Sequence, residues 1–143
     1  MGMWQMLAEA LLGGNSLWAA PVYISAAILR DQQQVATPVP FQLAPVVLGL
    51  MGHMMNTFVL AALFGWIAPK LSPSLGGPTG LGMLYGIAVF AVMWFLVVPL
   101  ADPVMLRLNT VSFLAAHVMW GIALGLVYGF GSAPPPRLQE QHA

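Results

Sequence analysis

The sequence predicts an all-α integral membrane protein, a four-helix bundle that forms a single membrane domain over residues 1–143. Three observations predict this fold class. Hydrophobic residues make up 59% of the chain and charged residues only 6%, whereas typical soluble domains carry about 25% charged residues. Four Lys/Arg and four Asp/Glu are too few to cover a globule of this size in water. Long apolar segments also alternate with short stretches rich in polar residues, proline and glycine.

A helix that crosses roughly 30 Å of hydrocarbon needs about 20 mainly apolar residues. The segments that meet this requirement are residues 3–29, 42–68, 80–100 and 110–131. The first is the least regular, because Glu9, Asn15, Ser16 and Pro21 lie inside it. A surface helix over residues 3–12 is the alternative to one long helix there. Residues 132–143 are expected to form an extended, mobile tail.

Four spans would place both termini on the same side of the membrane. Lys70 and Arg137 would then share that side with the amino terminus, opposite Arg30 and Arg107. The positive-inside rule favours cytoplasmic termini by a narrow margin. The first residues lack the basic stretch of a signal peptide, so we expect the chain to be retained whole.

The composition also excludes several function classes. The chain has no cysteine, so disulfides, thiolate metal sites and cysteine nucleophiles are excluded. The formal net charge of +0 gives no basic face for nucleic acid. Common catalytic motifs such as GxSxG, HExxH and the P-loop are missing from the sequence. We therefore expect a protein that is not an enzyme.

Residues 53–66 and 117–130 resemble each other when they are superimposed at matching histidines. Histidine, methionine, leucine and glycine coincide, and Phe64 falls on Tyr128. This pattern predicts an internal duplication, with two helix pairs related by an axis along the membrane normal. The alternative is that apolar helices with glycines look alike.

Small residues recur at every fourth position in these segments. Such stripes let helix backbones approach closely in lipid, where hydrophobic attraction between helices is weak. The sequence therefore predicts helix-packing faces at Thr57, Ala61 and Gly65, at Gly121, Gly125 and Gly129, and at Gly82 and Gly86.

The two histidines of the apolar segments lie near mid-membrane at similar depth. An ionisable residue there is costly, and it is expected to face the bundle interior. We predict that they belong to a buried polar cluster consisting of His53, Asn56, Thr57, His117, Asn15 and Ser16. The sequence leaves open whether the imidazoles fix helix contacts or bind a ligand.

Three sharper hypotheses concern His53 and His117. They could be the axial ligands of a b-type haem in an electron-transfer protein. They could instead bind copper or another metal with some of the ten methionines. However, Met55 and Met119 point away from their histidines by helical geometry, and Met54 is only one residue from His53, so no metal site is predicted. The third hypothesis is a small proton or solute transporter, in which Glu9 is the only acid inside a predicted span and is expected near the headgroups.

Three motifs carry a family resemblance: H-x11-G beginning at His53, the set Gly82, Gly86, Trp94 and Pro99, and H-x3-G-x3-G-x-x-Y-G beginning at His117. Through these motifs the sequence resembles a family of small four-helix membrane proteins of bacteria and archaea. The resemblance covers about residues 45–131, and residues of the first segment depart from it. It implies four spans and a bacterial cytoplasmic (inner) membrane. The family has no established activity, so the resemblance implies none.

These observations together predict a non-enzymatic membrane protein. We expect an accessory subunit of a membrane complex, or a homo-oligomer, that packs against other helices through its small-residue faces. The expected partners are the lipid bilayer and other membrane helices. No cofactor is expected, with haem b bound by His53 and His117 as the alternative.

Overall fold

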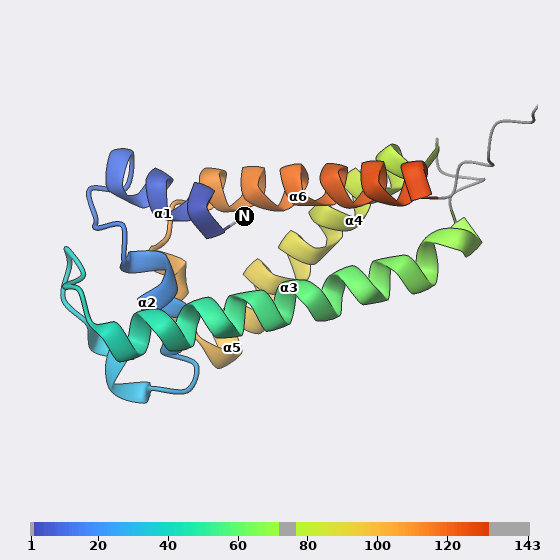
Figure 1. Cartoon of the computed structure of the whole chain (residues 1–143). Helices are drawn as coiled ribbons and strands as arrows, with labels where there is room; N and C mark the ends of the chain where they lie inside the picture. Colours follow the sequence, from blue (N-terminus) through green and yellow to red (C-terminus); the bar gives the residue numbers. More distant parts are fainter. Residues whose placement is uncertain (1, 72–76, 132–143) are drawn as a thin grey trace, which may run out of the picture.

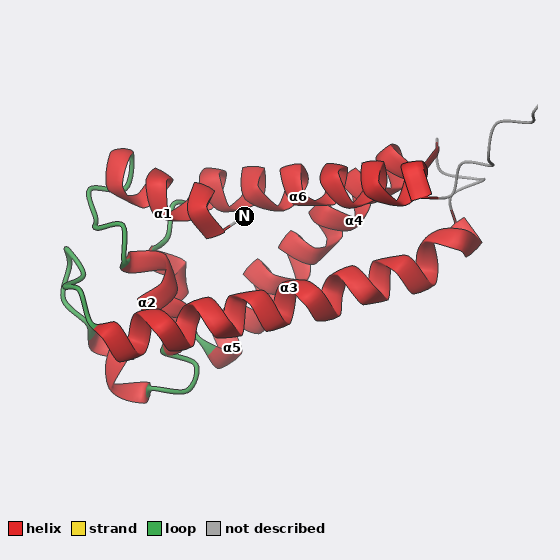
Figure 2. Cartoon of the chain, viewed as in Figure 1, coloured by secondary structure: helices red, strands yellow, loops and turns green. Residues whose placement is uncertain are grey.

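The computed structural model describes residues 2–71 and 77–131, and this part of the chain is helical without β-strands (Figures 1 and 2). Its elements are α1 Gly2–Leu11, α2 Ala19–Ser25, η1 Arg30–Gln34, α3 Leu43–Leu71, α4 Gly77–Val92, η2 Met93–Val97, α5 Val98–Ala101, η3 Pro103–Arg107 and α6 Thr110–Gly131. The expected tail, residues 132–143, lies outside the described residues.

Three helices are long and apolar enough to cross a membrane: Leu43–Leu71, Gly77–Ala101 and Thr110–Gly131. They match the second, third and fourth spans expected from the sequence. The all-helical class is therefore confirmed, and so is the presence of helices long and apolar enough to span a membrane. The protein is compatible with a lipid bilayer by the length and composition of these helices.

The single helix expected over residues 3–29 is corrected to two short helices. α1 ends at Leu11, and α2 begins at Ala19. Gly14 has a φ of 61°, a left-handed conformation that glycine adopts without strain and that ends helices. At about 1.5 Å per residue, neither helix spans the hydrocarbon. The prediction that both termini lie on the same side of the membrane required four spanning helices, and the first segment does not provide one of them.

The long helices run in alternating directions. In Figure 1, α3 and α6 run the same way along the molecule, and α4 returns between them. α1 lies beside the first half of α6, where the Trp4 indole N–H donates to the carbonyl of Ser112 over 3.1 Å. The helices α1 and α2 thus fill one end of the molecule. The expected duplication is not tested by these contacts and stays a prediction.

The most extensive close contact between helices joins α4 to α6 through several glycines. A Cβ on Gly82 would overlap the carbonyl oxygen of Gly121, and a Cβ on Gly86 would overlap that of His117. Gly125 lies equally tightly against the carbonyl of Pro78. Because no side chain separates the helices here, their backbones touch along several turns.

The remaining small residues have looser surroundings. A Cβ on Gly129 would meet the side chain of Pro78 at 3.4 Å, an ordinary contact. A Cβ on Gly65 would meet nothing within 4 Å, and Ala61 is half-buried. The α3 stripe therefore has open space at Gly65, unlike the α4–α6 contact.

α3 is attached to the rest of the molecule mainly toward its two ends. Near its start, Gly49 packs directly on the backbone of Pro21 in α2. Near its end, the buried Phe64 contacts the rings of Tyr85 and Tyr128, with centroids 5.2 and 6.1 Å away. The hydroxyl of Tyr85 donates to the carbonyl of Leu60 over 2.7 Å. In Figure 1, α3 and α6 lie nearest toward their C-terminal ends, and the separation between them widens toward their starts, where α1 and α2 lie.

The third span contains a π-helical turn, Met93–Val97, before α5. Pro99 follows this turn. Proline has no N–H to donate to the carbonyl four residues earlier, so the regular hydrogen-bond ladder is interrupted there. Single π-turns inside α-helices are frequent at functional sites.

The glycine contact gives a first test. Gly121→Ala should destabilise the protein by about 1–3 kcal/mol, because its new Cβ would overlap the carbonyl of Gly82. Gly65→Ala is the matched control, and it should be neutral or stabilising by up to about 1 kcal/mol since alanine favours helix. Thermal unfolding in a mild detergent measures both. Equal losses of stability would show that the α4–α6 backbone contact is not as close as described.

Candidate functional site

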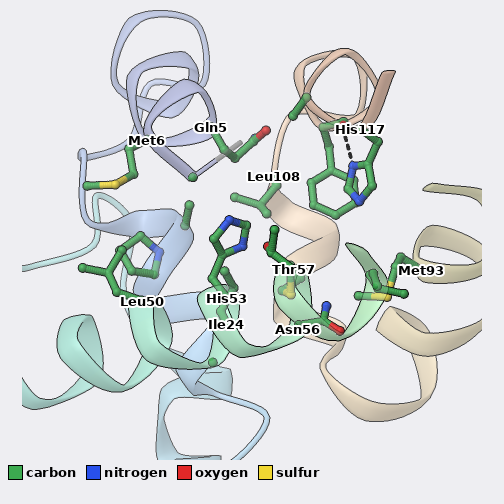
Figure 3. Close-up of a pocket in the computed structure, with 18 residues that line it drawn as sticks. Gln5, Met6, Ile24, Leu50, His53, Asn56, Thr57, Met93, Leu108 and His117 are labelled. Atoms are coloured by element: carbon green, nitrogen blue, oxygen red, sulfur yellow. Dashed lines mark hydrogen bonds between the residues drawn. The ribbon is translucent and has the colours of Figure 1, made fainter. Parts of the chain in front are cut away.

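His53 and His117 line one cavity of about 120 Å³. The cavity lies between α1, α2, α3, the π-turn and α6. Figure 3 shows His53 reaching from α3 toward α1, with His117 on the wall formed by α6. Apolar side chains form most of the remaining lining. The two histidines that the sequence placed at equal depth thus lie at one site.

His117 is held in a fixed orientation. The residue is 5% exposed, and its Nδ1 lies 2.8 Å from the carbonyl oxygen of Phe113 (dashed in Figure 3). Because a carbonyl only accepts hydrogen bonds, Nδ1 carries the proton and Nε2 is left with a free lone pair. The Phe113 ring packs on the imidazole with centroids 4.4 Å apart. α6 therefore presents a neutral imidazole with one available donor atom.

His53 is half-buried, and the start of α1 lies against its ring. A Cβ on Gly2 would meet two ring atoms at 3.4 Å. Asn56 and Thr57 follow on the same face of α3 and also line the cavity. Within the described part of the chain, no hydrogen bond is found for the side chains of His53, Asn56 or Thr57. His53 and Thr57 are half-buried, but Asn56 is exposed, so the α3 part of the predicted cluster lines the cavity without being fully buried.

Asn15 and Ser16, which the sequence added to the histidine cluster, lie elsewhere. They belong to the loop between α1 and α2. The amide of Asn15 donates to the Tyr23 hydroxyl over 3.0 Å, and its oxygen accepts from the Val39 N–H over 2.9 Å. The Ser16 hydroxyl donates to the Val39 carbonyl over 2.6 Å. Neither residue lines the cavity, because the broken first segment carries them into this separate network.

Methionines that sequence reasoning did not select contribute to the site. Met6 of α1, Met93 of the π-turn and Met105 of η3 line the cavity with the histidines. Met55 and Met119 are absent from the described lining, as helical geometry predicts. The three lining methionines are far from the histidines in the sequence, so no spacing rule could have identified them. A hollow of about 310 Å³ adjoins the cavity at His53 and Leu50 and is lined also by Met3 and Met54.

Glu9 is buried at the start of α6, and its expected position near the headgroups stays a prediction. It is 1% exposed, and its Oε1 accepts from the Asn109 N–H over 2.8 Å and from the Gln5 amide over 2.9 Å. The same Gln5 amide donates to the Ser112 hydroxyl over 2.9 Å. A carboxylate at this end also interacts favourably with the positive end of the helix dipole. Glu9 thus fixes α1 on α6, and Gln5 extends this network to the cavity wall.

A second polar junction ties the two loops at the same end of the molecule. Asp102 accepts a hydrogen bond from the Gln33 amide over 2.6 Å, and the Gln33 oxygen accepts from the Val104 N–H over 3.1 Å. Arg30 donates to the Ala101 carbonyl over 2.8 Å. Burial raises the pKa of Asp102 to about 6, although the Gln33 hydrogen bond and the Arg30 charge act to lower it. This carboxyl therefore titrates near neutral pH.

Comparisons with protein-family models, with curated proteins and with solved structures found no match for this chain. The resemblance to small four-helix membrane proteins of bacteria and archaea consequently stays a prediction from the motifs.

The Asp102 junction predicts a pH dependence of stability. The ordinary aspartate pKa of 3.8 rises to about 6 in the folded protein, so the folded state keeps its proton where the unfolded chain loses it. The free energy of unfolding should therefore be highest below the unfolded-state pKa of 3.8. It should fall by about 3 kcal/mol as the pH rises from there through the folded-state pKa of about 6. Unfolding temperatures measured from pH 4 to 8 should show this slope. Asp102→Asn should lose it, and an unchanged slope in that variant would contradict the assignment.

Proposed function

We propose that the protein is a non-enzymatic integral membrane protein that binds a small guest, an ion or a small molecule, in the cavity between α3 and α6. The observation that supports this most strongly is that His53, Thr57 and His117 line one cavity. The buried Gln5, whose Oε1 has no hydrogen-bond partner among the described residues, lines it as well. Polar groups left unpaired in an apolar environment cost free energy. A guest that bonds to them would recover that cost.

The size of the cavity favours a guest of few atoms. Pockets for drug-sized ligands measure about 300–1,000 Å³, whereas this cavity measures about 120 Å³. A haem held by both histidines would need α3 to move away from α6. The cavity itself, without the adjoining hollow of about 310 Å³, thus favours an ion or small molecule over the haem alternative. A proton or solute transporter would need a pathway in addition to this site.

Assembly with other membrane helices is a second candidate function, either as an accessory subunit or as a homo-oligomer. Its support is the open space beside Gly65, where a Cβ would meet nothing within 4 Å. The neighbouring α3 residues Met55 and Phe58 are also largely exposed. Small residues with no neighbour in their own chain are where another helix can approach closely. In the bilayer this face contacts either lipid or such a helix.

Native mass spectrometry of the protein extracted from its own membranes tests the guest-binding function. The wild-type chain should carry a discrete additional mass that His117→Leu loses, because leucine removes the free imidazole nitrogen. Met119→Leu is a control on the same helix, since Met119 does not line the cavity. A wild-type chain with no bound mass, or a mass retained by His117→Leu, would exclude this function.

Oligomeric state in lipid nanodiscs tests the assembly function. Subunit counting by single-molecule photobleaching should find more than one chain, or a copurifying subunit, at low protein-to-lipid ratios. Gly65→Leu should reduce association, because its side chain would fill the open space. Single chains without partners under all conditions would contradict the assembly function and leave the cavity assignment unaffected.

A further inference from the structure

We propose that the cavity is a copper(I) site, in which the imidazoles of His53 and His117 and methionine thioethers are the ligands. This inference rests on the proposed guest-binding function, because it names the guest. Met6, Met93 and Met105 line the same cavity as the two histidines. These donors come from α1, the π-turn, η3, α3 and α6, so the folded chain brings them to the lining of one cavity. The Met6 and Met93 sulfurs lie on opposite sides of His53 in Figure 3, so methionine side chains would turn toward a bound ion.

The hydrogen bond of His117 is the first argument for a metal. Metal-binding histidines commonly donate one ring N–H to a backbone carbonyl or carboxylate, which fixes the tautomer and the direction of the other nitrogen. His117 has this arrangement, with Nδ1 bonded to the Phe113 carbonyl at 2.8 Å. The imidazole of His53 has no hydrogen-bond partner among the described residues and is free to bind as well. Two neutral nitrogen ligands are therefore available from opposite helices.

The type of donor selects the metal. Thioethers are soft ligands that favour copper(I), whereas carboxylates, carbonyls and water suit calcium, magnesium and manganese. Figure 3 shows the thioethers of Met6 and Met93 among the side chains around the cavity. Methionine is flexible and can adjust its sulfur to a bound ion. Among the described residues no group of three or more His, Cys, Asp or Glu could hold a metal, so a site of the zinc type is not favoured.

The charges near the cavity favour an ion of low charge. The described lining contains no Asp, Glu, Lys or Arg, and the positive amino terminus acts on both histidines, so no negative group of the lining would offset the charge of a bound cation. The solvation cost of an ion rises steeply with its charge. A monovalent ion with soft neutral ligands is therefore better accommodated than a divalent one.

The test is anaerobic titration of the purified full chain in mild detergent with copper(I), supplied as its bicinchoninate complex. The protein should withdraw one copper per chain from this chelator. His117→Leu should weaken binding by at least about tenfold. The double variant Met93→Leu/Met105→Leu should weaken it by a similar factor, and X-ray absorption of the wild-type complex should show both nitrogen and sulfur neighbours.

Met55→Leu/Met119→Leu is the matched control, because it removes two methionines outside the cavity lining. It should bind copper like the wild type. Failure to withdraw copper, or equal affinities in both double variants, would overturn the copper assignment. If a different mass is then found in native spectra and is lost in His117→Leu, guest binding stands and only its identity as copper falls.

Discussion

The backbone contact between α4 and α6 is the constraint on which the rest of the structure depends. Gly82 and Gly86 lie directly against Gly121 and the carbonyl of His117, so these helices form one closely packed unit. Hydrophobic attraction between helices is weak in lipid, so close van der Waals contact between the backbones is what mainly holds the helices together. This unit carries His117, and Glu9 and Trp4 attach α1 to its beginning. α3 is added to it at only a few places.

The cavity follows from the way α3 is attached. One end of α3 is held by the contact of Gly49 with Pro21, and the other by the packing of Phe64 on aromatic rings. Between them, His53, Asn56 and Thr57 line the cavity. A helix that was purely structural would carry apolar residues there. The polar residues thus occupy a stretch of α3 that lines the cavity, and for this reason we relate them to a guest.

Much of the fold follows from the sequence, because long apolar segments between polar loops have few alternatives in lipid. The spans at 42–68, 80–100 and 110–131 correspond to observed helices. The first segment was wrong as a single helix, although Gly13, Gly14 and Asn15 gave a local signal for a helix end. The prediction of one helix relied on the average hydrophobicity of residues 3–29 and gave that signal too little weight. The break also explains why Asn15 and Ser16 bond to Tyr23 and Val39 instead of joining the histidines.

The sequence predicted the histidine pair of the site but not the methionines that line the cavity with it. Depth along parallel helices was enough to bring His53 and His117 together, since position within a span is a local property. The contributions of Met6, Met93 and Met105 depend on how α1, the π-turn and η3 fold back on the bundle, and no periodicity encodes that. The membrane location and the number of partners remain predictions.

The most direct test of the central claim is whether positions 53 and 117 face each other across the cavity in lipid. The chain has no cysteine, so His53→Cys/His117→Cys introduces the only pair of thiols. We expect a short bifunctional thiol reagent to join this pair rapidly in membranes, and to join the control pair Met55→Cys/His117→Cys slowly or not at all. Equal rates for the two pairs, or no cross-link between positions 53 and 117, would contradict the account.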